Sequence, residues 1–527
     1  MLVYKKNMKN LIKILLISVI TFGMNSCTEE KILDLEPINN IGEKDAFSTP
    51  TLIEAYMNGV YNAAGIGTYN SGSSNGGRGY VWGAAFVEQG DVRGEDLVNT
   101  ATFYELTYKA QIDAVSPNAV YYWSDGYRLI NRCNLMIEGV NDAVAKGTIT
   151  KAVGDDFIGQ SKFLRAITHL ELLTFFARPY NFTAGATHPG IPYREVGVNT
   201  QAEIASEIAK PRNTVAECYA KILADLNAAE ALITSNGFAG GRVVSKATKS
   251  AAIAFKTRVY LQKRDWANVI AEGTKLNGVY ALTATPSAPF VLASNLNNSE
   301  SIFSIQHSPT SNPNTNGALA SIFKSRTLVA ISPIIWRDPS WLVNDKRREE
   351  GVMIVTVGGR KYTNKYKDVT DLTDAAPVIR YAEVVLNMAE AQARLSAANL
   401  PTALTLLNSV RNRSLASPTD AYTLAGLSTQ ALMVKAILAE RRIEFLVEGR
   451  RWTDIHRLQG DDIAPIDGIP AKYDNLPPVP ADYTLGTPYT GSRPIAAIPG
   501  SDRRFLWPIP QIEMNTNPGL EQNDGWK

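Results

Sequence analysis

Residues 440–457 read ERRIEFLVEGRRWTDIHR and form the densest cluster of charge in the chain. Helical spacing places three carboxylates in one row, those of Glu440, Glu444 and Glu448. Two readings are open: a site for an anionic ligand, or a structural network of ion pairs. Both signs are interleaved rather than one being concentrated, which favours the network. The stretch therefore predicts helices that ion pairs hold against one another.

Outward from this stretch, most of the chain reads as amphipathic helices joined by long loops. Val378–Leu395 shows the clearest helical period, and Pro401 is placed to open a second helix over Thr402–Asn412. Lys246–Leu276 repeats this layout around a turn at Lys263-Arg264-Asp265, and such helix pairs resemble degenerate tetratricopeptide repeats. Further helices are expected over Asp156–Ala177, Val215–Ile233 and Gln430–Val447.

The predicted fold class is mainly α, a tetratricopeptide-like helical-repeat scaffold with a large loop-rich ligand-binding portion. The loop-rich regions lie at about residues 61–104, 281–376 and 460–510, where Gly, Ser, Asn and Pro gather. Loops this long in a compact protein are usually functional or disordered. We expect them to pack on the helical scaffold and to hold the binding site.

The N-terminus has the layout of a bacterial lipoprotein signal. Lysines precede an apolar stretch over residues 11–22, which is too short to span a bilayer, and Ser26-Cys27 resembles a lipobox. We expect a signal peptide over residues 1–26, a lipid on Cys27, a linker over residues 27–45 and a body over residues 46–527. An ordinary secreted protein with a cysteine near its cleavage site is the alternative.

Composition excludes several function classes. Lys and Arg number 53 against 51 Asp and Glu, so no excess positive field points to nucleic acid. Apart from Cys27, only Cys133 and Cys218 remain, without metal-ligand spacing. A disulfide between them is left open, and small core residues are the simpler reading.

Catalytic and cofactor motifs are weak. Residues 72–76 read GSSNG and match the G-x-S-x-G pattern, but the buried strand and following helix that a nucleophile elbow needs are missing. The four histidines are scattered, no phosphate loop occurs, and neither metal nor cofactor is predicted. A carboxylate pair of the glycosidase type stays open, because linear sequence gives no separation between carboxylates.

Several motifs carry a resemblance to the SusD/RagB family. They are the 440–455 stretch, LNMAEAQA at 386–393, KFLRA at 162–166 with RPY at 178–180, and LWPIPQIEMNTNPGLEQN at 506–523. These motifs occur in family order from the lipobox to the last ten residues. The chain is thereby identified as similar to this family over nearly its whole length.

The resemblance implies a non-catalytic lipoprotein on the outer face of the outer membrane. It would capture an oligosaccharide or polysaccharide and deliver it to a TonB-dependent barrel of the SusC type. The shared motifs belong to the scaffold, so they transfer no binding residues. A peptide-capturing surface protein is one alternative, and a glycoside hydrolase is a weaker one.

Candidate binding residues follow from the chemistry of sugars, whose apolar faces stack on aromatic rings beside hydrogen-bonding groups. Two clusters of this kind are predicted as ligand-binding: Tyr69, Arg78, Tyr80 and Trp82 near the Gly-rich stretch, and Trp336, Arg337, Asp338 and Trp341. For each ring the alternative is a place in the local core.

Overall fold

The computed structural model describes residues 43–68, 77–237 and 244–526. The chain divides into two compact units, residues 1–53 and residues 54–527. The described part of the first unit holds α3 (Glu43–Ala46) and the beginning of α4 (Pro50–Ile66), which continues into the second unit. The predicted signal peptide and Cys27 lie outside the described residues.

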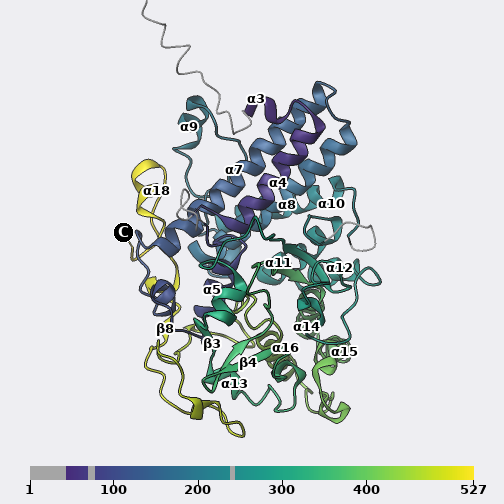
Figure 1. Cartoon of the computed structure of the whole chain (residues 1–527), viewed down its shortest axis with the longest axis vertical. Helices are drawn as coiled ribbons and strands as arrows, with labels where there is room; N and C mark the ends of the chain where they lie inside the picture. Colours follow the sequence, from purple (N-terminus) through teal and green to yellow (C-terminus); the bar gives the residue numbers. More distant parts are fainter. Residues whose placement is uncertain (1–42, 69–76, 238–243, 527) are drawn as a thin grey trace, which may run out of the picture. The chain divides into compact units, whose positions relative to one another are not determined.

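Three long helices of the second unit pack side by side (Figure 1): α7 (Pro117–Ala145), α8 (Lys151–Phe176) and α10 (Val215–Leu232). α8 packs against both of the others. A capping box between Thr214 and Glu217 starts α10 by satisfying its first N–H groups. On α4, the Tyr61 hydroxyl donates to Gln160 Oε1 of α8 over 2.8 Å. The helices predicted over 156–177 and 215–233 are confirmed.

A second group of helices forms hairpins: α11 (Lys249–Lys263), α12 (Trp266–Thr274), α14 (Tyr381–Leu395), α15 (Leu400–Arg411) and α16 (Gln430–Glu444). α11 packs on α12, α12 on α14, and α14 on both α15 and α16. The first hairpin turns at Arg264, which adopts a left-handed φ of 60°, and Asp265 then caps α12. The mainly helical, tetratricopeptide-like fold is confirmed.

Shorter elements fill the regions between these helices. The short helices are α5 (Ala84–Val92), α6 (Glu105–Tyr108), α9 (Gln201–Glu207), α13 (Pro333–Trp336), α17 (Arg451–Arg457) and α18 (Gln511–Thr516). In the described ranges the strands pair into antiparallel two-stranded sheets: β1 (Leu97–Asn99) with β3 (Val329–Ile331), β2 (Ser301–Ile305) with β6 (Ala376–Arg380), β4 (Ile354–Val357) with β5 (Arg360–Thr363), and β7 (Gly468–Ile469) with β8 (Ile498–Pro499). β1–β3 and β2–β6 join segments far apart in sequence.

Two predicted helix boundaries were wrong, and the first is the end expected at Val447, because α16 already stops at Glu444. The helix expected from Val378 begins only at Tyr381, because residues 376–380 form β6 and pair with β2. Val378 and Ile379 suit a buried strand as well as a helix, so periodicity alone could not separate the two. Arg258 fixes this strand by donating to the Val378 carbonyl over 2.7 Å.

The 440–457 stretch spans the end of α16, a turn and α17, and its charges form a buried ion-pair network. Glu444 pairs with Arg413 at 2.6 Å and with Arg380 at 3.1 Å, and Arg380 also reaches Glu448 at 2.8 Å. Burial would raise the pKa of Glu444, but Arg413 and Arg380 hold it well below its usual range. The predicted structural network is confirmed.

No helix in the described ranges is long and apolar enough to cross a membrane.

Candidate functional site

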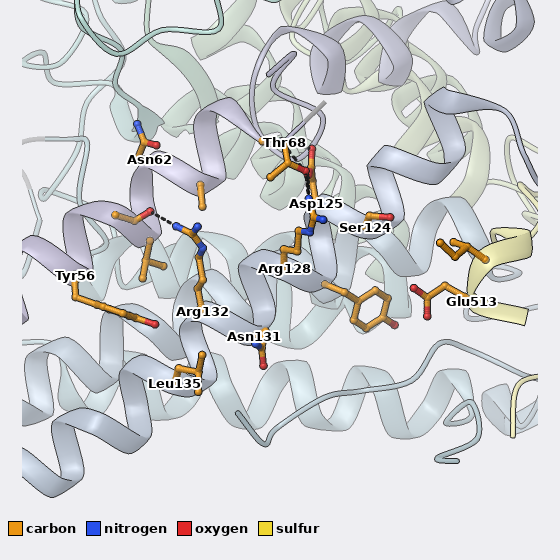
Figure 2. A pocket seen from close by; sticks show the side chains of 16 residues that line it. Tyr56, Asn62, Thr68, Ser124, Asp125, Arg128, Asn131, Arg132, Leu135 and Glu513 are labelled. Atoms are coloured by element: carbon orange, nitrogen blue, oxygen red, sulfur yellow. Dashed lines mark hydrogen bonds and ion pairs between the residues drawn. The ribbon is translucent and has the colours of Figure 1, made fainter. Parts of the chain in front are cut away.

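The main cleft is a cavity of about 920 Å³ between α4, α7 and α18 (Figure 2). Polar side chains from all three helices line it, together with two tyrosines; the lining includes Tyr56, Asn62, Thr68, Ser124, Asp125, Tyr127, Arg128, Asn131, Arg132, Leu135, Ile512 and Glu513. Its volume lies in the range of small-molecule sites. Because most of these residues sit on helices, the cleft is held by the scaffold itself.

Asp125 anchors one wall of the cleft. Its side chain is buried, and Oδ1 and Oδ2 accept from the Thr68 backbone N–H at 3.0 and 3.1 Å. Gly67, the residue before Thr68, has a φ of +74°, and a Cβ on Gly67 would collide with Asp125 Oδ2. Burial raises the pKa of Asp125 above its usual range, although the bonds from Thr68 lower it in part. The carboxylate therefore fixes how the chain leaves α4.

Arg128 and Arg132 lie one turn apart on α7 and face the same cleft (Figure 2). Like charges at this spacing repel each other slightly, so the pair gives the helix no stability. Both side chains are exposed; Arg128 donates to Thr68 Oγ1, and Arg132 donates to the Gly59 carbonyl at 3.3 Å. A guanidinium has five N–H donors, so each arginine keeps donors for a ligand's hydroxyl or carboxylate oxygens.

Two aromatic rings contribute apolar surface to the cleft. Tyr127 is half-buried, and its hydroxyl donates to the Pro192 carbonyl over 2.8 Å, which fixes the ring. Tyr56 is also half-buried, on α4. Rings of this kind beside hydroxyl, amide and guanidinium groups suit a ligand that has both apolar faces and many hydroxyls.

Glu513 of α18 closes the far end of the cleft (Figure 2). Burial raises the pKa of its carboxyl above the usual glutamate range, while Arg194 and a hydrogen bond from Trp123 oppose that rise. Asp125 and Glu513 are the carboxylates in the lining. Since Asp125 already accepts bonds from Thr68, it is poorly placed to act as a nucleophile or base.

The first predicted cluster lies mainly in the interior. Tyr80 and Trp82 are fully buried; the Tyr80 hydroxyl donates to Asn118 Oδ1 at 3.2 Å and the Trp82 indole to Thr168 Oγ1 at 3.3 Å. Arg78 is half-buried and lies 3.9 Å from the Phe103 ring centroid. Tyr69 lies outside the described residues. As packed, the two buried rings offer no face to a ligand.

The second predicted cluster does come together in space, beside β4, β5 and the 480–488 segment. Trp336 and Trp341 pack edge to face at 5.3 Å, with 4% and 3% of their surfaces exposed. Arg337 is half-buried and donates to the Thr487 carbonyl at 2.8 Å. Asp338 accepts from Arg442 at 3.4 Å. These contacts give all four residues a packing role, and ligand binding by them stays a prediction.

The remaining candidate residues lie either in the core or outside the described residues. Cys133 and Cys218 are both buried and free, so they are core residues. His169 and His456 are buried, and burial lowers the pKa of each to about 3. The GSSNG stretch lies outside the described residues. Within the ranges that the structure describes, no group of three or more His, Cys, Asp or Glu side chains could hold a metal ion.

Sequence reasoning missed the cleft residues on α7. Arg128, Asn131, Arg132 and Leu135 recur at helical spacing, which marks one face of a helix but not what covers that face. Only the packing of α4 and α18 beside this face makes it concave. The arginine pair one turn apart, Arg128 and Arg132, was the available signal.

Comparison with known proteins places these features in a family. A model described as the SusD family matches residues 342–526, and one described as starch-binding associating with outer membrane matches residues 31–261. A SusD-like protein of Formosa agariphila is 22% identical, covering 98% of this chain and 99% of that protein. A second from the same organism is 23% identical, covering 96% and 98%.

Solved structures share the fold. A SusD superfamily protein from Bacteroides fragilis is 26% identical with a TM-score of 0.72, covering 90% of this chain and 100% of that one. A SusD-like carbohydrate binding protein from Bacteroides vulgatus is 20% identical with a TM-score of 0.69, covering 90% and 97%. The likeness therefore extends over both the helical scaffold and the loop-rich regions.

Proposed function

Because this chain belongs to the SusD/RagB family, we propose that it is a non-catalytic glycan-binding lipoprotein of the outer membrane. The observation that carries the proposal is the cleft between α4, α7 and α18. There, two half-buried tyrosine rings lie beside exposed guanidinium and amide groups on rigid helices. Rings bind the apolar faces of a sugar, and the polar groups bind its hydroxyls.

The cleft favours binding over hydrolysis. A glycosidase needs two carboxyl groups on either side of the scissile bond, one as acid and one as base or nucleophile. In this lining the carboxyl of Asp125 is buried and bonded to Thr68, which leaves Glu513 without an available partner. We therefore propose that the protein releases bound glycan without cleaving it.

Delivery to a SusC-like TonB-dependent barrel completes the proposed role, with Cys27 as the lipid anchor and residues 28–45 as the tether. Support comes from the lipobox-like sequence at Cys27 and from the family model that describes outer-membrane association. Orientation toward the cell exterior is part of the same proposal. A Cys27→Ala variant should lose membrane retention and keep its glycan affinity.

Affinity electrophoresis against a panel of polysaccharides tests the glycan-binding proposal. The mature protein should be retarded by at least one polysaccharide, and a reducing-end assay on the same mixture should show no release of sugar. Retardation with new reducing ends would favour a glycosidase. Binding of peptides with no retardation by any polysaccharide would favour a peptide-capturing protein.

A further inference from the structure

A second, smaller pocket adjoins the main cleft. Its volume is about 250 Å³, and it lies between α7, the 194–198 segment, α9 and α18. Tyr127, Asn131 and Glu513 line both cavities, so the two are adjacent. Figure 2 shows Asn131 and Glu513 among the side chains that line the main cleft. A ligand in the cleft can therefore extend a substituent into the smaller pocket.

Five aliphatic side chains form one part of the wall of this apolar pocket, namely Ile130, Val196, Val198, Ile204 and Ile208. Ile204 and Ile208 of the α9 region are 40% and 37% exposed, and Val196 is 36% exposed. Apolar surface gathered in a concavity gains free energy when a ligand covers it. The wall thus favours an apolar occupant.

The amides that line the apolar pocket are already paired with protein. Asn131 donates to the Val198 carbonyl at 3.0 Å and accepts from the Val198 N–H at 2.8 Å. Asn134 donates to the Val196 carbonyl at 2.9 Å, and its Oδ1 accepts from Arg165 at 2.8 Å. Both side chains hold the 194–198 segment in place, so the pocket is formed before any ligand arrives.

Two further polar lining residues, Arg194 and Asn517, are paired in the same way. Arg194 donates to Glu207 Oε2 at 3.1 Å, and Asn517 Oδ1 accepts from the Gly519 N–H at 2.9 Å. A sugar ring placed here would lose hydrogen bonds to water and would regain only part of them, because the Asn131, Asn134 and Asn517 amides are already bonded to protein. A second saccharide unit is therefore disfavoured in this pocket.

We infer that this pocket binds an aryl substituent, such as an aromatic ester or an aryl aglycone, carried by a sugar bound in the main cleft. The inference rests on the proposed glycan-binding function. A cavity of about 150 Å³ with aliphatic walls holds one benzene ring, so this larger pocket accommodates a substituted ring. Glycans that bear an aromatic group should bind more tightly than the same glycans without it.

The test uses methyl benzoate as the probe, because it presents the ring and ester without any sugar. Saturation-transfer NMR should show binding to the mature protein. Two variants should abolish the signal: Ile204→Gln, which places an amide in the wall, and Ile208→Trp, which fills the pocket. The matched control is Val153→Gln on α8, an exposed valine outside both cavities, and it should bind as the parent does.

A second measurement links the pocket to the sugar. For a sugar of a polysaccharide that retards the protein, the 4-nitrophenyl glycoside should bind at least about tenfold more tightly than the methyl glycoside. Ile204→Gln should remove this difference. No binding of methyl benzoate to the parent would overturn the inference. Binding by Ile204→Gln and Ile208→Trp as strong as by the parent would overturn it too. Failure of the proposed function is distinguishable from this result. In that case no polysaccharide would retard the protein, while methyl benzoate would still bind.

Discussion

Asp125 is the residue that sets the geometry at the edge of the cleft. Its carboxylate accepts the Thr68 N–H and hydroxyl while it is almost fully buried, and Gly67 makes room for it. A buried hydrogen bond to a charged acceptor contributes more than one between neutral groups. The position of Thr68, and with it one wall of the cleft, depends on this single side chain.

Asp125→Ala should lower the free energy of unfolding by about 1.5–3 kcal/mol, because the Thr68 donors lose a charged acceptor. Urea denaturation measures the change. Asp142→Ala is the control, since Asp142 is exposed and pairs with Lys146 at the end of the same helix, at 3.3 Å. An equal loss in the two variants would contradict the anchoring role.

Trp82 belongs to the core rather than to an open binding surface. Its ring packs against Phe86 at 4.8 Å and against Phe255 at 6.3 Å. Trp82→Ala should therefore cost about 3–5 kcal/mol of stability. Thermal unfolding would show this as a large fall in Tm. An unchanged Tm with weaker glycan binding would instead place Trp82 in contact with the ligand.

Tyr56→Ala should weaken glycan binding and leave the Tm nearly unchanged, in contrast to Trp82→Ala. Tyr56 is half-buried and lines the cleft, so removing its ring takes away stacking surface with a small effect on the core. We expect glycan affinity to fall by about fivefold to tenfold, given about 1 kcal/mol for a stacked ring. Isothermal titration and a thermal melt of the same sample separate the two effects.

Residue type predicted the chemistry of a sugar site but not its location. Trp82 and Trp336 have the side chains that sugar receptors use, and burial removes both from solvent. Exposure is set by elements far away in sequence; the Trp336 indole, for example, donates to the Tyr483 carbonyl at 3.1 Å. A local sequence pattern contains no information about which distant segment will bury a side chain.

At the scale of elements, α5 and the turn before α17 approach each other through two glycines. A Cβ on Gly90 would collide with the Gly449 carbonyl, and Gly449 itself has a φ of +75°. The Gly449 N–H donates to Asp91 Oδ2 over 3.0 Å. This close approach joins the 440–457 stretch to the loop-rich region that begins near residue 61.

Gly90→Ala should destabilise the protein by about 1–3 kcal/mol, because the added methyl forces the two backbones apart. Chemical denaturation provides the measurement. Gly426→Ala is the matched control, since its Cβ would make only an ordinary contact, 3.4 Å from Thr423 Oγ1. If the Gly90 variant were as stable as the control, the contact would not constrain the fold.

Helix pairs could be predicted because their apolar period is local and their ends carry caps. Thr214 before α10 and Pro401 at the start of α15 are such signals. The small sheets could not be predicted, because β1 pairs with β3 more than two hundred residues later, Leu97 facing Ile331. Such pairing is decided by the scaffold that brings the segments together.

At the scale of the whole molecule, buried charge makes stability depend on pH. Burial would raise the pKa of Glu390, but Arg457 and Arg394 lower it to about 2. A carboxyl with a lowered pKa stabilises the fold above its unfolded value, near 4.5, and loses this contribution as pH falls toward 2. His456, with a pKa lowered to about 3, loses its contribution from about pH 6.5 downward.

The stability that Glu390 and His456 contribute should therefore fall between pH 6.5 and pH 3, with the part from Glu390 lost below about pH 4.5. Asp125 and Glu513, whose pKa values are raised, act in the opposite direction, so the comparison of the parent with Glu390→Gln isolates the part from Glu390. Differential scanning calorimetry across this range measures it. Glu390→Gln should lower the Tm at pH 7 and flatten the fall below pH 4.5, because the titrating group is gone. The same change of Tm with pH in the parent and in Glu390→Gln would mean that Glu390 titrates alike in the folded and unfolded states.

We propose that the cleft between α4, α7 and α18 captures glycan. Affinity electrophoresis in a polysaccharide that retards the parent protein should show a clear loss of retardation for the double variant Arg128→Ala/Arg132→Ala, because both exposed guanidiniums line the cleft. Arg493→Ala, which removes an exposed arginine elsewhere, should migrate as the parent does. Full retardation of a folded double variant would contradict the account.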